Sequence, residues 1–150
     1  MNILYSTFLI GAAWYDLKDR RIPVWLFYGF GILGMLGRLL TLVSGFEERL
    51  SARALGIQFL TALLPGAALL AITFCSRGEI GAGDGCFFLV SACYLDAVLL
   101  FLLLVGGLFL CTSCSLGIVV WGIWGHVSVR RIRLPFLPFL VPVWLLLTLF

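Results

Sequence analysis

The chain has 150 residues, of which 63% are hydrophobic and only 11% are charged. Soluble domains are closer to half apolar and a quarter charged, and a chain this short cannot bury so much apolar surface in a soluble fold. The net charge of +3 is too small to indicate a nucleic-acid-binding protein. Because the apolar runs are continuous rather than alternating, they predict membrane helices rather than a β-barrel. We therefore expect an all-α, polytopic membrane protein.

The apolar runs predict about six transmembrane helices in a single domain that covers residues 1–150. A bilayer core of about 30 Å needs about 20 helical residues. The first, fourth and sixth runs are shorter than this, whereas the fifth is long enough to tilt. In chain order, the runs are Ile3–Tyr15, Pro23–Ser44, Ala54–Cys75, Cys86–Leu95, Ala97–Gly125 and Pro135–Phe150.

Lysine and arginine are concentrated in alternate loops. The first, third and fifth loops contain seven of them, the second loop contains two and the fourth contains none. The positive-inside rule then places the first, third and fifth loops in the cytoplasm and both termini outside. We expect Arg20, Glu79 and Arg131 at the cytoplasmic face, and Glu47 and Asp96 at the outer face.

Two aspartates fall at the predicted cytoplasmic face, since Asp16 ends the first run and Asp84 precedes the fourth. Like charges a few ångströms apart cannot both ionise, so in such a pair one pKa rises and the other falls. One aspartate can then activate water while the other protonates or polarises a carbonyl. The alternative is a charged residue that merely ends a membrane helix, which is how we interpret Asp19, Glu79 and Asp96.

Glycines surround the second aspartate in the segment Gly81-Ala82-Gly83-Asp84-Gly85. Each glycine costs about 1 kcal/mol relative to alanine in a helix, so we expect a loop here rather than a helix end. Such a loop permits unusual dihedral angles and lets another backbone approach closely, as an extended substrate strand would need. Gly81, Gly83 and Gly85 are therefore candidates for shaping a substrate site, and a plain connecting loop is the alternative.

The other polar residues of the apolar runs have structural interpretations. The five cysteines predict small packing residues rather than a disulfide framework. Cys111 and Cys114 have no second pair and no nearby histidine, as a zinc site would need. Arg38 is expected to reach the outer interface rather than to be a buried functional charge, and His126 to anchor a helix end. No cluster has metal-binding spacing, so we expect no metal and no cofactor.

Three segments carry a resemblance to a known family. Asp16 is followed by a basic stretch and then Ile22-Pro23, and Gly81-Ala82-Gly83-Asp84 reads Gly-x-Gly-Asp. Together they resemble the type IV prepilin peptidases, a family of Gly-x-Gly-Asp membrane aspartic proteases. The segment Pro135-Phe136-Leu137-Pro138-Phe139 resembles the opening of that family's last helix. Val24 and Cys86 stand where the family commonly has Asn and often has Lys, which leaves the substrate preference open.

The resemblance implies that Asp16 and Asp84 are catalytic and that Pro23 and the three glycines of the Gly81–Gly85 segment shape substrate binding. It implies an aspartic endopeptidase of a prokaryotic inner membrane that removes the short basic leader of prepilin-like precursors at the cytoplasmic face. The expected partners are these precursors and the lipid bilayer, with no nucleic acid. The family's N-terminal domain with paired Cys-x-x-Cys motifs has no counterpart here, so we expect no methyltransferase activity.

Two other classes of membrane protein remain open. Small six-span proteins are often transporters or assembly subunits, and such a protein would tolerate Asn in place of either aspartate. A presenilin-like or signal-peptide-peptidase-like protease would share Tyr15-Asp16 and the Gly-x-Gly-Asp motif. Those proteases have more spans and a Pro-Ala-Leu motif near their end, where this chain has Pro135-Phe136-Leu137.

Overall fold

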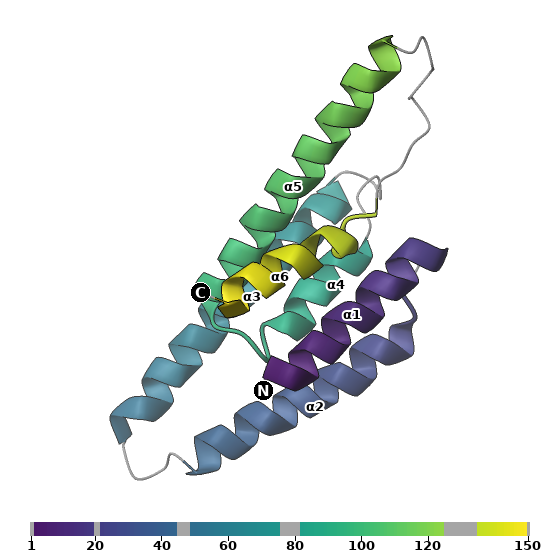
Figure 1. The fold of residues 1–150 in the computed structure, drawn as a ribbon. Helices are drawn as coiled ribbons and strands as arrows, with labels where there is room; N and C mark the ends of the chain where they lie inside the picture. The colour runs from purple at the N-terminus through teal and green to yellow at the C-terminus, as the bar shows by residue number, and fades with distance from the viewer. Residues whose placement is uncertain (1, 20–21, 45–48, 76–81, 125–134, 150) are drawn as a thin grey trace.

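The fold is a bundle of helices whose directions alternate along the chain (Figure 1). The computed structural model describes residues 2–19, 22–44, 49–75, 82–124 and 135–149. Within these ranges there is no strand, so the predicted all-α class is confirmed. The elements are α1 (Asn2–Asp19), α2 (Val24–Ser44), α3 (Arg49–Cys75), α4 (Ala82–Ser91), α5 (Ala97–Trp124), the 3-10 helix η1 (Leu137–Phe139) and α6 (Leu140–Leu149).

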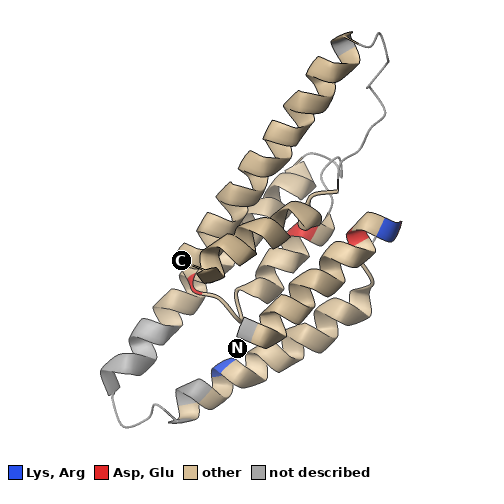
Figure 2. Ribbon diagram, viewed as in Figure 1, with Lys and Arg blue, Asp and Glu red and all other residues tan. Residues whose placement is uncertain are grey.

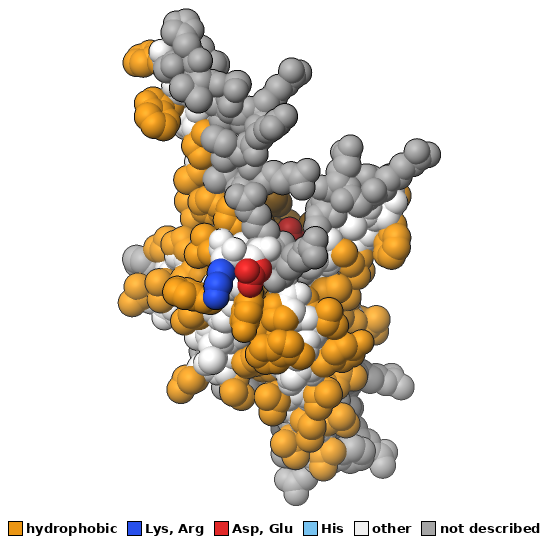
Figure 3. Space-filling view, turned by 90° about the vertical axis from the view of Figure 1, so that its right-hand side faces the viewer, with side chains coloured by type: hydrophobic (Ala, Val, Ile, Leu, Met, Phe, Trp, Pro, Cys, Tyr) orange, Lys and Arg blue, Asp and Glu red, His pale blue; other side chains and the backbone are white. Residues whose placement is uncertain are grey.

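The face of the bundle seen in Figure 3 is largely apolar where the structure describes it. Large side chains such as Ile10, Leu40 and Phe109 are 59%, 66% and 71% exposed. The stretches Gly56–Cys75 in α3 and Ala97–Gly122 in α5 are long and apolar enough to cross a membrane, and only 17% of each is buried inside the protein. Such large exposed apolar surfaces need lipid as their solvent. The chain is therefore a membrane protein.

The helix bounds agree with the predicted apolar runs except at a few ends. Helix α3 begins at Arg49 rather than at Ala54, and the last run enters its α-helix through η1. The fourth run differs most, because α4 covers Ala82–Ser91 and turns replace the predicted helix as far as Leu95. The amides of these turn residues still bond to carbonyls near the end of α4.

Helix α4 is enclosed by the other helices, and its Phe87 and Phe88 side chains are fully buried. Glycines let its neighbours approach closely. A Cβ atom at Gly66 of α3 would lie 2.7 Å from the backbone nitrogen of Leu89, and one at Gly34 of α2 would overlap the turn that follows α4. Small residues allow this close contact between membrane helices. This packing holds the C-terminal half of α4 closely against α2 and α3.

Aromatic contacts join the two ends of the chain in the core. The Tyr5 ring of α1 lies 4.6 Å from the Trp144 ring of α6, centre to centre. The Trp144 Nε1–H donates a hydrogen bond of 2.9 Å to Ser6 Oγ. On the neighbouring face of α1, the Phe8 ring stacks on the Phe87 ring of α4 at 5.0 Å. Helix α1 is therefore held against both α4 and α6.

An ion pair lies beyond the C-terminal end of α4. Arg38 Nη2 of α2 is 3.7 Å from Asp96 Oδ1, in the turn before α5. The guanidinium carbon also lies 5.9 Å from the centre of the Phe59 ring of α3. The side chain of Arg38 is 17% exposed and that of Asp96 is 62% exposed. The Arg38 side chain is thus mostly buried, and it has a protein partner in the turn before α5 that the sequence did not indicate.

Several residues singled out in the sequence lie outside the described residues. The predicted topology depends on the charges of their loops and stays a prediction. These residues are Arg20, Glu47, Glu79, Gly81, His126 and Arg131.

Candidate active site

The two candidate aspartates lie in helix ends at the same side of the bundle. Asp16 lies in the last turn of α1 and Asp84 in the first turn of α4. Acidic residues mark the end of α1 and the start of α4 in Figure 2. These two helix ends point the same way because α1 and α4 run in opposite directions (Figure 1).

A chain of contacts through η1 links one aspartate to the other. Phe88 follows Asp84 by four residues, so both side chains are on one face of α4. The Phe88 ring packs 6.4 Å from the Phe136 ring, centre to centre. The next residue, Leu137, donates its backbone N–H to Asp16 Oδ2 at 3.1 Å. The start of η1 therefore bonds to Asp16 and packs against Phe88, one turn along α4 from Asp84.

The electrostatics of the pair follow from burial and from like charge. Asp84 precedes the apolar run of the fourth helix and lies outside the two spans in α3 and α5. Burial, together with a smaller contribution from the negative charge of Asp16, raises the pKa of Asp84 from 3.8 to about 6. The Asp84 carboxyl thus holds a proton closer to neutral pH than an ordinary aspartate does. A carboxyl of this kind can donate a proton in a reaction at physiological pH.

The two halves of the sequence pattern meet next to Asp84. A Cβ atom at Gly83 would lie 3.5 Å from Ile22 Cδ1. The neighbouring Pro23 carbonyl accepts a hydrogen bond of 3.0 Å from the Leu26 N–H and so starts α2. The Ile-Pro segment therefore packs beside the first turn of α4, where the second aspartate lies.

The prediction of a glycine loop is wrong for Gly83 and Gly85. Both lie in the first turn of α4, and neither has the positive φ that only glycine adopts easily. Gly85 is buried, and a Cβ atom there would lie 2.7 Å from the Leu70 side chain and 3.1 Å from the Leu70 backbone nitrogen. The close contact between α3 and α4 outweighs the low helix propensity of glycine. An acidic residue in the first turn, here Asp84, also favours a helix N-terminus.

Two neighbours of the acids were not connected with the site by the sequence. The Cys111 thiol of α5 interacts electrostatically with Asp84, although the cysteine lies in the middle of an apolar run. The Leu137 backbone amide cannot be recognised from its residue type, because almost every residue has such an amide. Only the prolines on either side distinguish its segment in the sequence. The described cysteines are all free thiols. In the described part of the chain, no group of three or more His, Cys, Asp or Glu side chains is placed to hold a metal ion.

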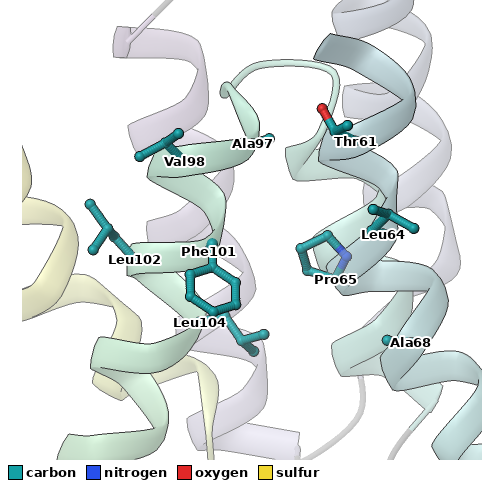
Figure 4. Close-up of a pocket in the computed structure, with 9 residues that line it drawn as sticks. All are labelled: Thr61, Leu64, Pro65, Ala68, Ala97, Val98, Phe101, Leu102 and Leu104. Atoms are coloured by element: carbon teal, nitrogen blue, oxygen red, sulfur yellow. The ribbon is translucent and has the colours of Figure 1, made fainter. Parts of the chain in front are cut away.

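A separate apolar groove of about 590 Å³ lies between α3 and α5 (Figure 4). Thr61 Oγ1 is used in its own helix, where it donates to the carbonyls of Ile57 and Gln58. The groove therefore offers no charged group to an ion or a polar solute, and it does not support the transporter interpretation. Its lining residues are Thr61, Leu64, Pro65, Ala68, Ala97, Val98, Phe101, Leu102 and Leu104.

A comparison with protein families decides between the remaining classes. The model of the type IV leader peptidase family matches residues 3–121, which include both aspartates. The chain belongs to the type IV leader peptidase family. The resemblance to prepilin peptidases is thereby confirmed, and leader peptidase activity on prepilin-like substrates is the general function of this family. No curated protein and no solved structure matches the chain.

Proposed function

We propose that this leader peptidase is an aspartic endopeptidase whose catalytic pair is Asp16 and Asp84. The observation that carries the proposal is the half-buried Asp84 carboxyl, whose pKa of about 6 is raised by burial and by the charge of Asp16. Strongly perturbed carboxyls beside a second charge are typical of acid–base sites. The position of both residues at helix ends adds support, because a soluble leader and water reach a helix end more easily than the middle of a bundle.

The reaction is hydrolysis, and two carboxyls that share one proton are sufficient for its proton transfers. In the first step, one carboxylate takes a proton from water, the water oxygen adds to the scissile carbonyl carbon, and the other carboxyl gives its proton to the carbonyl oxygen. In the second step, the C–N bond breaks. The newly protonated aspartate gives its proton to the leaving nitrogen, and the other recovers a proton from a hydroxyl of the intermediate. The products are a carboxyl terminus and a free amine, and no methyl transfer takes place.

The proposed substrates are prepilin-like precursors with a short basic leader followed by an apolar helix. We place the cut at the cytoplasmic face of a prokaryotic inner membrane, because the basic loops of the sequence orient this end of the bundle inward. Pro23, Gly81 and Gly83 shape the approach of the substrate to the acids. Gly85, by contrast, serves the packing of α4 against Leu70.

The test is processing of a prepilin-like precursor by variants of both acids. Asp16→Asn and Asp84→Asn keep the shape of the side chain but cannot cycle a proton, so each should lower processing by about a thousandfold or more. The double variant should be no worse than either single variant, because residues that act as one unit are not additive.

Asp19→Asn is the matched control, since Asp19 is exposed on the same helix as Asp16. It should process the precursor at the wild-type rate. The membrane abundance of each variant is measured in parallel, by quantitative immunoblot. Substantial processing by either Asp16→Asn or Asp84→Asn, at normal abundance, would overturn the proposed mechanism.

A further inference from the structure

The carboxylate of Asp16 is held by a backbone donor from the other end of the chain. The Leu137 N–H donates to Asp16 Oδ2 at 3.1 Å, across 121 residues of sequence. Leu137 is fully buried, so water does not compete freely for its amide. Hydrogen bonds between a backbone amide and a carboxylate are among the stronger ones in proteins.

The sequence around Leu137 explains why its amide is available. The first amides of any helix have no carbonyl partner in that helix. In η1, Pro138 has no N–H, the Phe139 N–H bonds to the Phe136 carbonyl, and the Leu140 N–H bonds to the carbonyls of Leu137 and Pro138. The Leu137 N–H therefore has no acceptor within the helix. It donates instead to the carboxylate of Asp16 in α1.

The donor is also fixed in place by packing on two sides. The Phe136 ring lies 6.4 Å from the Phe88 ring of α4, centre to centre. From α5, a Cβ atom at Gly107 would lie 3.3 Å from both Phe136 Cζ and Leu140 Cγ, so the backbone of α5 approaches η1 closely. A donor held in this way does not need to reorganise during a reaction.

The two acids therefore have different surroundings. A hydrogen bond to the charged form of a carboxyl favours that form, whereas burial favours the neutral form. We propose that the Leu137 backbone N–H is a positioning group of the active site, which keeps Asp16 ionised as the base and leaves Asp84 as the acid. The inference rests on the proposed function and deepens it. In the first step, Asp16 takes the proton of water and Asp84 gives its proton to the carbonyl oxygen.

The neighbouring elements contribute further titratable groups, but η1 and α6 contribute none. A backbone substitution leaves all of these side chains unchanged, so a change in pH dependence can be assigned to the amide. The groups on the described parts of the neighbouring elements are Tyr5, Tyr15, Lys18 and Asp19 on α1, Tyr28 and Arg38 on α2, Asp84 and Cys86 on α4, and Cys111 and Cys114 on α5.

The test replaces the Leu137 amide by an ester, using the α-hydroxy acid analogue of leucine introduced by nonsense suppression. The side chain stays the same and the N–H becomes an oxygen atom. We expect kcat/KM for a prepilin-like precursor to fall at least about tenfold, and the acidic limb of its pH profile to move up by about one pH unit. The direction follows because loss of the donor makes Asp16 easier to protonate.

An ester at Leu140 is the matched control. Leu140 has the same side chain and is also fully buried, and its N–H bonds to carbonyls of η1 rather than to Asp16. This ester should leave the acidic limb where it is in the wild type. An unshifted limb in the Leu137 ester, or the same shift in both esters, would overturn the inference.

A second measurement does not depend on the ester variants folding. Infrared difference spectra between the wild type and Asp16→Asn, and between the wild type and Asp84→Asn, report the carboxyl bands that each substitution removes. At pH 5 we expect Asp16→Asn to remove an ionised band and Asp84→Asn to remove a protonated one. The reverse assignment would overturn the inference. Failure of the proposed function is a different result, namely processing by the Asp→Asn variants themselves.

Discussion

Replacing Asp84 by Asn is expected to make the protein inactive and, above pH 6, more stable. The pKa of Asp84 rises from 3.8 to about 6 in the folded protein. Below pH 3.8 the carboxyl is protonated in both the folded and the unfolded state, so folding does not have to bury a charge there. Between these two values the unfolded chain releases the proton while the folded protein keeps it, and stability falls as the pH rises.

The size of the effect follows from the same numbers. A pKa change from 3.8 to about 6 corresponds to about 3 kcal/mol of unfolding free energy. Because the carboxyl is half-buried rather than fully enclosed, we expect about 2 to 3 kcal/mol. Asn carries no charge, so Asp84→Asn should be more stable than the wild type by this amount at pH 7.5, and no more stable at pH 3.5.

The assay is thermal unfolding of the purified protein in detergent micelles at both pH values. Asp19→Asn, an exposed aspartate of α1, is the control and should change stability little at either pH. A variant Asp84→Asn that is no more stable than the wild type at pH 7.5 would refute the reasoning. An equal gain at both pH values would also refute it, because a charge-burial cost must disappear when the carboxyl is protonated.

Two further predictions concern packing and the distant ion pair. Gly85→Ala should lower the unfolding free energy by about 1 to 2 kcal/mol, because its Cβ would lie 2.7 Å from the Leu70 side chain. Gly83→Ala should keep wild-type stability, since its nearest neighbour would lie at 3.5 Å, and a comparable loss at both positions in thermal unfolding would contradict this. Asp96→Asn should cost at most about 1 kcal/mol, because its side chain is 62% exposed beside Arg38. It should also leave precursor processing near the wild-type rate, and a loss of processing would connect the ion pair with the reaction.

The helix count and most helix ends could be predicted from the sequence, because continuous apolar runs separated by charged loops are typical of membrane helices. The helical conformation of the glycine segment could not be predicted. Propensity is a local quantity, and it has no information about Leu70, which fills the space beside Gly85 and makes a helix favourable there. The bounds of α4 were therefore the least accurate.

The functional site, too, could be predicted from the sequence only in part. Asp16 and Asp84 could be selected because their side chains and their motifs are visible in the sequence. The ion pair between Arg38 and Asp96 could not be predicted, because an arginine near a helix end can equally well reach the membrane interface without a protein partner. The Leu137 donor could not be selected either, since every residue except proline has a backbone amide. In the sequence, the segment Pro135–Phe139 stood out only by its resemblance to the opening of the family's last helix.

The hydrogen bond between Asp16 and Leu137 also sets when the site is completed during synthesis. The two residues are 121 positions apart, so the acids of α1 and α4 leave the ribosome long before the donor of η1. Until η1 is synthesised, a nascent chain contains both aspartates but not the amide that holds the first one. This hydrogen bond therefore forms only after η1 has been synthesised and has packed against α1.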